Sequence, residues 1–161
     1  MDKTKLIEVL RDHPFLQGMK PDHVAKMADL AQEVHIARDQ MIFRQGDESG
    51  LFYLILSGKV ALEATAPGRI LRVQTVGAGE ELGWSSALSE GGKNFQARVL
   101  EPVQVLTFDG ARLRQAFQED PVFGYQFLQR LVQVVARRLQ VTRMRLVDTY
   151  AATADEAAVL A

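Results

Sequence analysis

The stretch from Met41 to Val60 constrains the fold of this chain more than any other part of it. Two apolar runs typical of strands, Ile42–Phe43 and Leu51–Leu56, are separated by a turn at Gly46–Asp47. A second glycine, Gly58, follows the longer run and predicts a tight reversal into a third strand. The pattern indicates antiparallel β structure.

Beyond about residue 32 the chain continues in short segments of alternating apolar and polar residues, and Gly or Pro lies in most of the gaps between them. Many short strands at this spacing favour a sandwich or a jelly-roll barrel over a parallel α/β sheet. The predicted strands are residues 33–37, 40–44, 51–56, 59–65, 70–76, 95–100 and 103–108.

Helices are predicted on both sides of this β region. Residues 3–12 form a short amphipathic segment, and Pro21 suits the first turn of a second helix. Asp109 is a suitable N-cap for a helix over residues 110–117. Asp120 followed by Pro121 is a strong start signal for a last helix, which we expect to end near Val147.

This last helix would be on the order of 40 Å long at 1.5 Å per residue, which exceeds what a small barrel can cover. Its apolar residues recur at spacings of three and four and therefore form one stripe. We expect a homodimer through residues 121–147. The stripe consists of Leu128, Leu131, Val135, Leu139, Thr142 and Leu146.

The composition is that of an ordinary soluble globular protein, with 47% apolar and 24% charged residues among 161. No apolar run reaches the length of a membrane span or of a signal-peptide core. The sequence has no cysteine, which excludes disulfides and thiolate metal sites. We therefore expect a cytoplasmic protein with no membrane contact.

The net charge of −1 conceals a basic segment, because residues 121–147 contain five arginines and no Asp or Glu. Such a helix face can contact a polyanion. It can equally pair with carboxylates of the same protein or of its dimer mate, and the sequence leaves both interpretations open.

Enzymatic function is not predicted. A cupin-like enzyme would share the jelly-roll architecture, but it needs several His and a carboxylate that converge on one metal. The three histidines, His13, His23 and His35, are isolated, and each is expected at a surface or at a helix end. Ser85 and Ser86 have no histidine after them in the chain. We therefore predict no catalytic residue and no metal site.

The span from about Pro14 to Asp148 resembles the sensor domain of the CRP/FNR superfamily, the cyclic-nucleotide-binding domain of catabolite-activator-type regulators. The resemblance is carried by the Gly46–Asp47 turn, by Ser57–Val60 and by Ala136–Thr142. It implies a mainly β fold with flanking helices: a double-stranded β-helix jelly roll (the cyclic-nucleotide-binding-like β-roll) plus a long C-terminal dimerisation helix. The domains would be N-terminal helices (1–30), a β-roll sensor (31–120), the dimerisation helix (121–150) and a frayed tail (151–161).

In that family a phosphate-binding cassette holds the ligand, and the corresponding segments here are Gly79–Leu88 and Gly92–Arg98. Small residues after its glycine would expose backbone N–H groups to an anionic phosphate. Trp84 replaces the glutamate that accepts the ribose hydroxyl, and Lys93 lies near the place of the phosphate-binding arginine. The expected ligand-binding residues are Gly83, Trp84, Ser85, Ser86, Ala87, Lys93 and Asn94, and Thr142 and Arg143 on the dimer helix are candidates for a base contact.

The resemblance therefore implies a non-catalytic sensor module with a degenerate cassette. Its ligand would be an anionic small molecule or a cyclic nucleotide, cyclic AMP-like, bound in a weakened or altered manner, and no other cofactor is implied. The alternative is a ligand-free dimeric scaffold that acts through a protein partner. Because no helix-turn-helix is recognised after the long helix, direct DNA binding by this chain is not expected.

Overall fold

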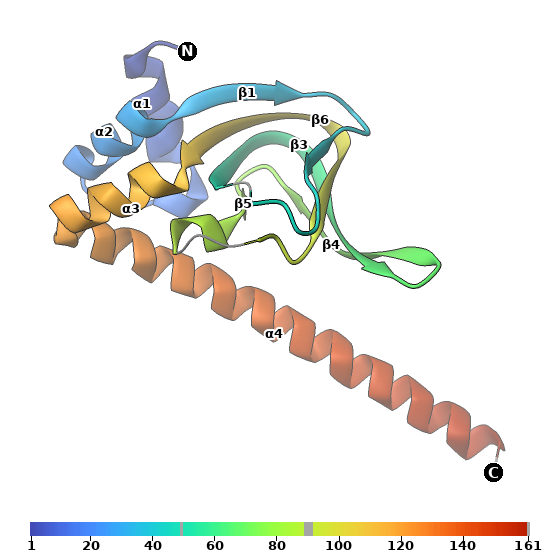
Figure 1. The fold of residues 1–161 in the computed structure, drawn as a ribbon. Helices are drawn as coiled ribbons and strands as arrows, with labels where there is room; N and C mark the ends of the chain where they lie inside the picture. The colour runs from blue at the N-terminus through green and yellow to red at the C-terminus, as the bar shows by residue number, and fades with distance from the viewer. Residues whose placement is uncertain (49, 89–91, 161) are drawn as a thin grey trace. The chain divides into compact units, whose positions relative to one another are not determined.

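The strands of the chain belong to one antiparallel sheet, visible in Figure 1 as a curved roll. The computed structural model describes residues 1–48, 50–88 and 92–160, which fall into two compact units, residues 1–126 and 127–161. The first unit contains every described strand. Its strands are β1 (Gln32–Ile36), β2 (Met41–Phe43), β3 (Leu51–Ala66), β4 (Arg69–Gly77), β5 (Glu81–Leu82) and β6 (Gln96–Asp109).

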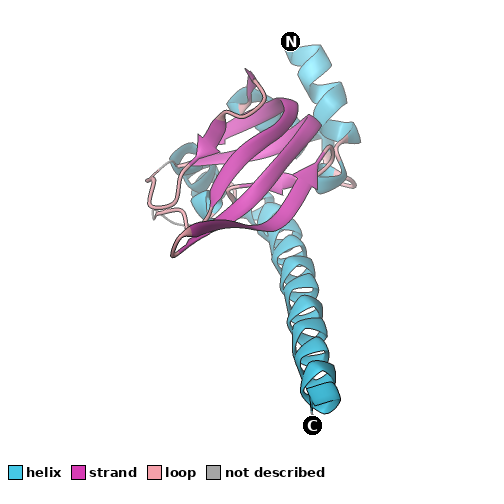
Figure 2. Cartoon of the chain, turned by 90° about the vertical axis from the view of Figure 1, so that its right-hand side faces the viewer, coloured by secondary structure: helices cyan, strands magenta, loops and turns pink. Residues whose placement is uncertain are grey.

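Strand β3 is the centre of the sheet. The strand order is β1-β6-β3-β4, with β2 paired to β6 and β5 paired to β3. Val60 of β3, for example, lies opposite Val76 of β4 on one side and Val99 of β6 on the other. Figure 2 shows these strands side by side in one curved layer. The predicted mainly β class with flanking helices is confirmed.

The prediction of a tight reversal at Gly58 is wrong. Residues 51–66 form one continuous strand, and residues 96–109 form another that continues across Pro102. Two separate strands had been predicted in each of these regions. Gly58 has φ +92°, and a Cβ built on it would lie 2.3 Å from the carbonyl oxygen of Pro102. The β3–β6 register also shifts around Gly58. Both strands therefore bend together at this point, because a glycine irregularity in a strand can produce a bend without ending the pairing.

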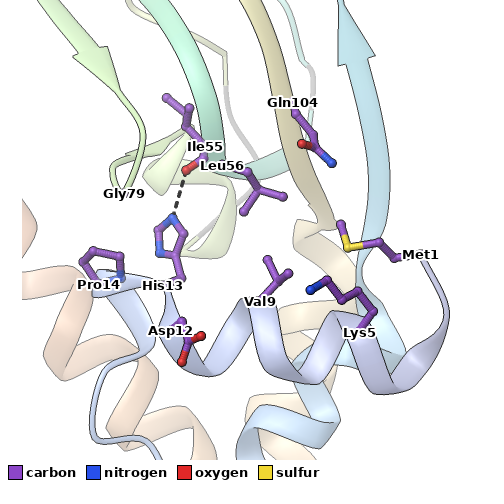
Figure 3. Close-up of a pocket in the computed structure, with 10 residues that line it drawn as sticks. All are labelled: Met1, Lys5, Val9, Asp12, His13, Pro14, Ile55, Leu56, Gly79 and Gln104. Atoms are coloured by element: carbon purple, nitrogen blue, oxygen red, sulfur yellow. Dashed lines mark hydrogen bonds between the residues drawn. The ribbon is translucent and has the colours of Figure 1, made fainter.

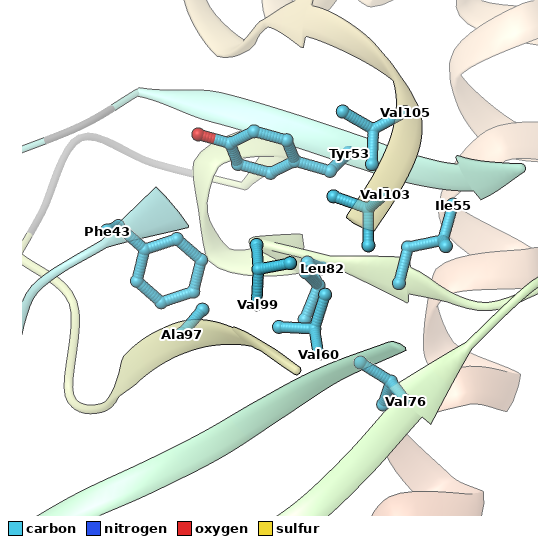
Figure 4. Packing of buried hydrophobic residues seen from close by; sticks show 10 residues of the cluster. All are labelled: Phe43, Tyr53, Ile55, Val60, Val76, Leu82, Ala97, Val99, Val103 and Val105. Atoms are coloured by element: carbon cyan, nitrogen blue, oxygen red, sulfur yellow. The ribbon is translucent and has the colours of Figure 1, made fainter. Parts of the chain in front are cut away.

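The interior of the roll is filled by aliphatic side chains with two aromatic rings (Figure 4). In β6 the residues that face it follow the two-residue period of a strand, because successive side chains point to opposite faces. The buried members of this cluster are Phe43, Tyr53, Ile55, Val60, Val76, Leu82, Ala97, Val99, Val103 and Val105. The face of the sheet that carries Ala97 therefore lines the interior of the roll.

The helices begin largely where the capping residues predict. They are α1 (Lys3–Asp12), η1 (Pro14–Leu16), α2 (Pro21–Leu30), η2 (Trp84–Ala87), α3 (Gly110–Glu119) and α4 (Pro121–Leu160). Asp109 accepts the backbone N–H of Arg112 at 2.9 Å, and Asp120 accepts that of Phe123 at 3.2 Å. Both predicted N-caps are confirmed.

Helix α4 is longer than predicted, since it continues to Leu160 instead of ending near Val147. The additional residues are rich in alanine, the strongest helix former, and contain no Gly or Pro. Leu139 and Leu146 of the apolar stripe are 48% and 53% exposed. Among the helices that the structure describes, none combines the length and the apolar character needed to cross a bilayer.

Candidate functional site

The candidate site is built around Gly83, which joins β5 to the short helix η2. Gly83 has φ +70°, and a Cβ at this position would lie 2.5 Å from the carbonyl oxygen of Leu51. A larger residue would therefore clash with the backbone of β3, in addition to adopting an unfavourable conformation. The carbonyl of Gly83 accepts the backbone N–H of Ser86 at 3.0 Å, which closes the first turn of η2.

Lys93 is the central polar side chain of the site. It is only 5% exposed, and its ammonium donates a hydrogen bond of 2.6 Å to the hydroxyl of Ser86. The same nitrogen lies 5.2 Å from the centre of the Phe43 ring, within the range of a cation–π contact. Burial lowers the pKa of Lys93. Its nitrogen is also 3.3 Å from the position that a Cβ on Gly83 would occupy, so the ammonium lies beside the glycine.

The loop that carries Lys93 is held by the Gly46–Asp47 turn. The backbone N–H of Gly46 donates to the carbonyl of Lys93 at 2.8 Å, and the N–H of Lys93 donates to the carbonyl of Asp47 at 3.0 Å. The carboxylate of Asp47 in turn accepts the N–H of Arg44 at 2.8 Å. This reciprocal backbone pair fixes the position of Lys93, so the turn that dominates the sequence pattern also supports the site.

Helix α3 supports η2 from a second side. The guanidinium of Arg114 donates to the carbonyl of Ser86 at 2.5 Å. A Cβ on Gly110, the first residue of α3, would lie 2.3 Å from the same carbonyl oxygen. Sequence reasoning did not select Phe43, Arg114 or Gly110 as site residues. Their roles depend on contacts between segments that are distant in the chain. Gly110 alone could have been noticed in the sequence, because a glycine at the start of a helix can indicate a close backbone contact.

The structure brings Gly83, Ser86 and Lys93 together, as the resemblance implies. Trp84 and Ser85 are half-buried in η2, and Ala87 is buried. Asn94 is exposed, and no hydrogen bond of its side chain is found among the described residues. The expectation of free backbone N–H groups does not hold for Ser86, whose N–H is occupied by Gly83. The polar groups that the structure places together here are therefore the side chains of Ser86 and Lys93.

Thr142 and Arg143, the candidates for a base contact, lie on the part of α4 that belongs to the second unit. Both residues are exposed. The hydroxyl of Thr142 donates to the carbonyl of Arg138 at 2.9 Å, four residues earlier in the same helix. This is the usual local bond of a helical threonine.

The histidines have structural partners. His13 is buried, its Nδ1 accepts the N–H of Phe15 at 3.2 Å, and its Nε2 bonds the carbonyl of Ile55 at 3.1 Å. His23 is also buried and lies in the first turn of α2, one of the helix-end positions expected, with Nδ1 2.7 Å from Gln126 Oε1. His35 lies 3.1 Å from Glu33. No group of three His, Asp or Glu residues suited to a metal ion occurs in the described parts of the chain.

Comparison with known proteins identifies the same architecture. The model of the cyclic nucleotide-binding domain family matches residues 33–120. The CRP-like cAMP-activated global transcriptional regulator of Mycobacterium tuberculosis is 29% identical over 142 residues, which are 88% of this chain and 62% of the regulator. The cyclic AMP receptor protein of Thermus thermophilus is 30% identical over 132 residues, 81% of this chain and 59% of the receptor.

Among solved structures, a cyclic nucleotide-binding domain from Methylobacillus flagellatus KT superposes with a TM-score of 0.78 at 21% identity. The match covers 91% of this chain and 83% of that domain. The chain thus spans about three fifths of the length of the two curated regulators.

Proposed function

The chain belongs to the cyclic nucleotide-binding domain family, and on this premise we propose that it is a non-catalytic sensor module that binds a small anionic ligand at Lys93. The ligand is either an anionic metabolite or a cyclic nucleotide bound more weakly than in relatives with an intact cassette. We further propose that the sensor works as a homodimer through α4 and signals to a protein partner, without direct DNA binding.

The observation that carries this proposal is the environment of the Lys93 ammonium. Its contacts are the hydroxyl of Ser86 and the ring of Phe43, and no carboxylate lies within 4.0 Å of it in residues 1–48, 50–88 and 92–160. Burying a charge is costly unless the charge is paired. An anion beside Lys93 would supply the missing charge.

Inorganic phosphate is the simplest test of the Lys93 site. We expect saturable phosphate binding by calorimetry, and we expect Lys93→Met to weaken it at least tenfold, about 1.4 kcal/mol, because the buried ammonium beside Ser86 is removed. Lys59→Met removes the same charge from an exposed lysine that pairs with Glu101, and it should change the affinity less than about twofold. Equal losses in both variants, or no binding by the unmodified protein, would contradict the proposal.

Trp84 distinguishes a cyclic-nucleotide sensor from a sensor for another anion. The indole offers one N–H donor and no acceptor, so it cannot replace the glutamate that accepts a ribose hydroxyl. We expect cyclic AMP to leave the melting temperature of the unmodified protein nearly unchanged. Trp84→Glu combined with Lys93→Arg should give a clear increase, since a ligand at 100 times its Kd adds about 2.7 kcal/mol of stability.

The control for this prediction is Trp84→Leu combined with Lys93→Arg, which removes the ring without restoring an acceptor. Stabilisation in the control as large as in the Glu variant would mean that the indole acts only by occlusion. Low-micromolar binding of cyclic AMP by the unmodified protein would contradict the prediction outright. If neither phosphate nor cyclic AMP binds, the ligand-free dimeric scaffold becomes the better interpretation.

A further inference from the structure

A cavity of about 440 Å³ lies between α1 and the bends of the sheet (Figure 3). Residues of the N-terminal segment and α1 line one side, and residues of β3, β6 and the turn before β5 line the other. None of the residues that line it belongs to η2 or to the loop of Lys93. Its volume lies within the range of about 300 to 1,000 Å³ that is common for small-molecule sites.

The residues that line the cavity combine an apolar strip with two cationic groups, the ammonium of Lys5 and the N-terminal ammonium of Met1, which pairs with Glu33 at 2.9 Å. Val9 and Leu56 provide apolar surface, and the ammonium of Lys5 points toward Val9 (Figure 3). Lys5 and Val9 are four residues apart, so they are adjacent on one face of α1, about 6 Å apart along its axis. The nearest carboxylate to Lys5 among the described residues is that of Glu8, at 3.7 Å, which exceeds hydrogen-bond length.

The other titratable groups of the cavity are already engaged. The two ring nitrogens of His13 form hydrogen bonds with the backbone of Phe15 and Ile55. Burial lowers the pKa of His13, which favours the uncharged ring. Asp12 lies at the opposite end of the cavity from Lys5 and pairs with Arg11 at 3.5 Å. Lys5 is therefore the group with spare donor capacity beside the apolar strip.

We propose that this cavity binds a small amphipathic carboxylate, with its carboxylate on the Lys5 ammonium and its hydrocarbon chain on Val9 and Leu56. A chain of about five or six carbons spans the single helical turn between Lys5 and Val9. Ligands of this class use both features of the wall, whereas an alcohol of equal length uses only the apolar strip. The site is independent of the anion site at Lys93.

Hexanoate is the probe that tests this site, followed by amide chemical shifts and by calorimetry on the full chain. We expect saturable binding with shifts at Val9, Leu56 and Gly79, and weaker binding of hexanol and hexylamine. Lys5→Glu should weaken hexanoate binding at least fivefold, because it replaces attraction by repulsion. Lys3→Glu, the same change on α1 at a residue that does not line the cavity, should change it less than about twofold.

Val9→Trp provides a second variant, since the larger ring fills the apolar strip and should abolish hexanoate binding without removing a charge. The amide spectrum of each variant verifies that it is folded. Absence of saturation up to about 20 mM, a range that includes weak millimolar binders, would overturn the proposal, and so would equal affinity for hexanol. Loss of hexanoate binding in Lys93→Met but not in Lys5→Glu would place the carboxylate in the other site and would also overturn it.

Discussion

Replacing Gly58 by alanine is expected to lower the free energy of unfolding by about 3 kcal/mol or more. The residue has φ +92°, a conformation that costs an L-amino acid about 1 to 2 kcal/mol. The new Cβ would also lie 2.3 Å from the carbonyl oxygen of Pro102 and 2.6 Å from Val103 Cγ1. Because the Pro102 oxygen belongs to the backbone of β6, the clash with it can be relieved only by moving backbone.

Gly68→Ala is the matched control for this prediction. Gly68 also has a positive φ, +75°, but a Cβ on it would meet no atom within 4 Å. The control should therefore show the conformational cost alone, about 1 to 2 kcal/mol. Urea unfolding at one fixed protein concentration measures both values. Similar decreases in the free energy of unfolding in the two variants would show that the backbone of β6 moves away from Gly58 at little cost, and would contradict the prediction.

Leu139→Glu is expected to convert the proposed dimer into monomers at a protein concentration of tens of micromolar. Leu139 lies in the middle of the α4 stripe and is 48% exposed in the single chain. A parallel helix pair would bury two carboxylates at this position, each without a partner. We expect the dimer dissociation constant to rise at least about 100-fold, or 2.7 kcal/mol. Light scattering and sedimentation measure the change.

Gln140→Glu introduces the same charge one residue further along α4, at an exposed position outside the stripe. It should leave the association state unchanged. Dissociation by both variants would point to a general charge effect instead of a helix seam. A monomeric unmodified protein at the same concentration would contradict the dimer itself.

Most elements of the fold can be predicted from the sequence, because their signals are local. The N-caps Asp109 and Asp120 and the short apolar runs depend on neighbouring residues alone. The reversal expected at Gly58 failed for a different reason. A glycine permits either a tight turn or a bend within a strand. Which of the two occurs at Gly58 depends on its pairing with β6 near Pro102, which is distant in the sequence. The alanine-rich end of α4 was predicted to be frayed, but the helix continues through it to Leu160, because alanine is the strongest helix former.

The site could be predicted only in part. The resemblance placed Lys93 near Gly83 and Ser86, and the structure brings all three together. The ring of Phe43 below the ammonium and the support of Ser86 by Arg114 could not be predicted, since each joins segments far apart in the sequence. The availability of the Ser86 amide was overestimated, because the sequence does not reveal how tightly η2 is wound.

The central position of β3 has a consequence for the speed at which this domain forms. Near its end, β3 pairs with β4 across a short hairpin, Thr65 with Ile70. Near its start, it pairs with the last residues of β6, Leu51 with Asp109, so almost the whole β region lies inside that loop. Local pairs close quickly, whereas distant pairs must first overcome the entropy of a long loop. We therefore expect the hairpin to form early and the roll to close only when β6 pairs with β3.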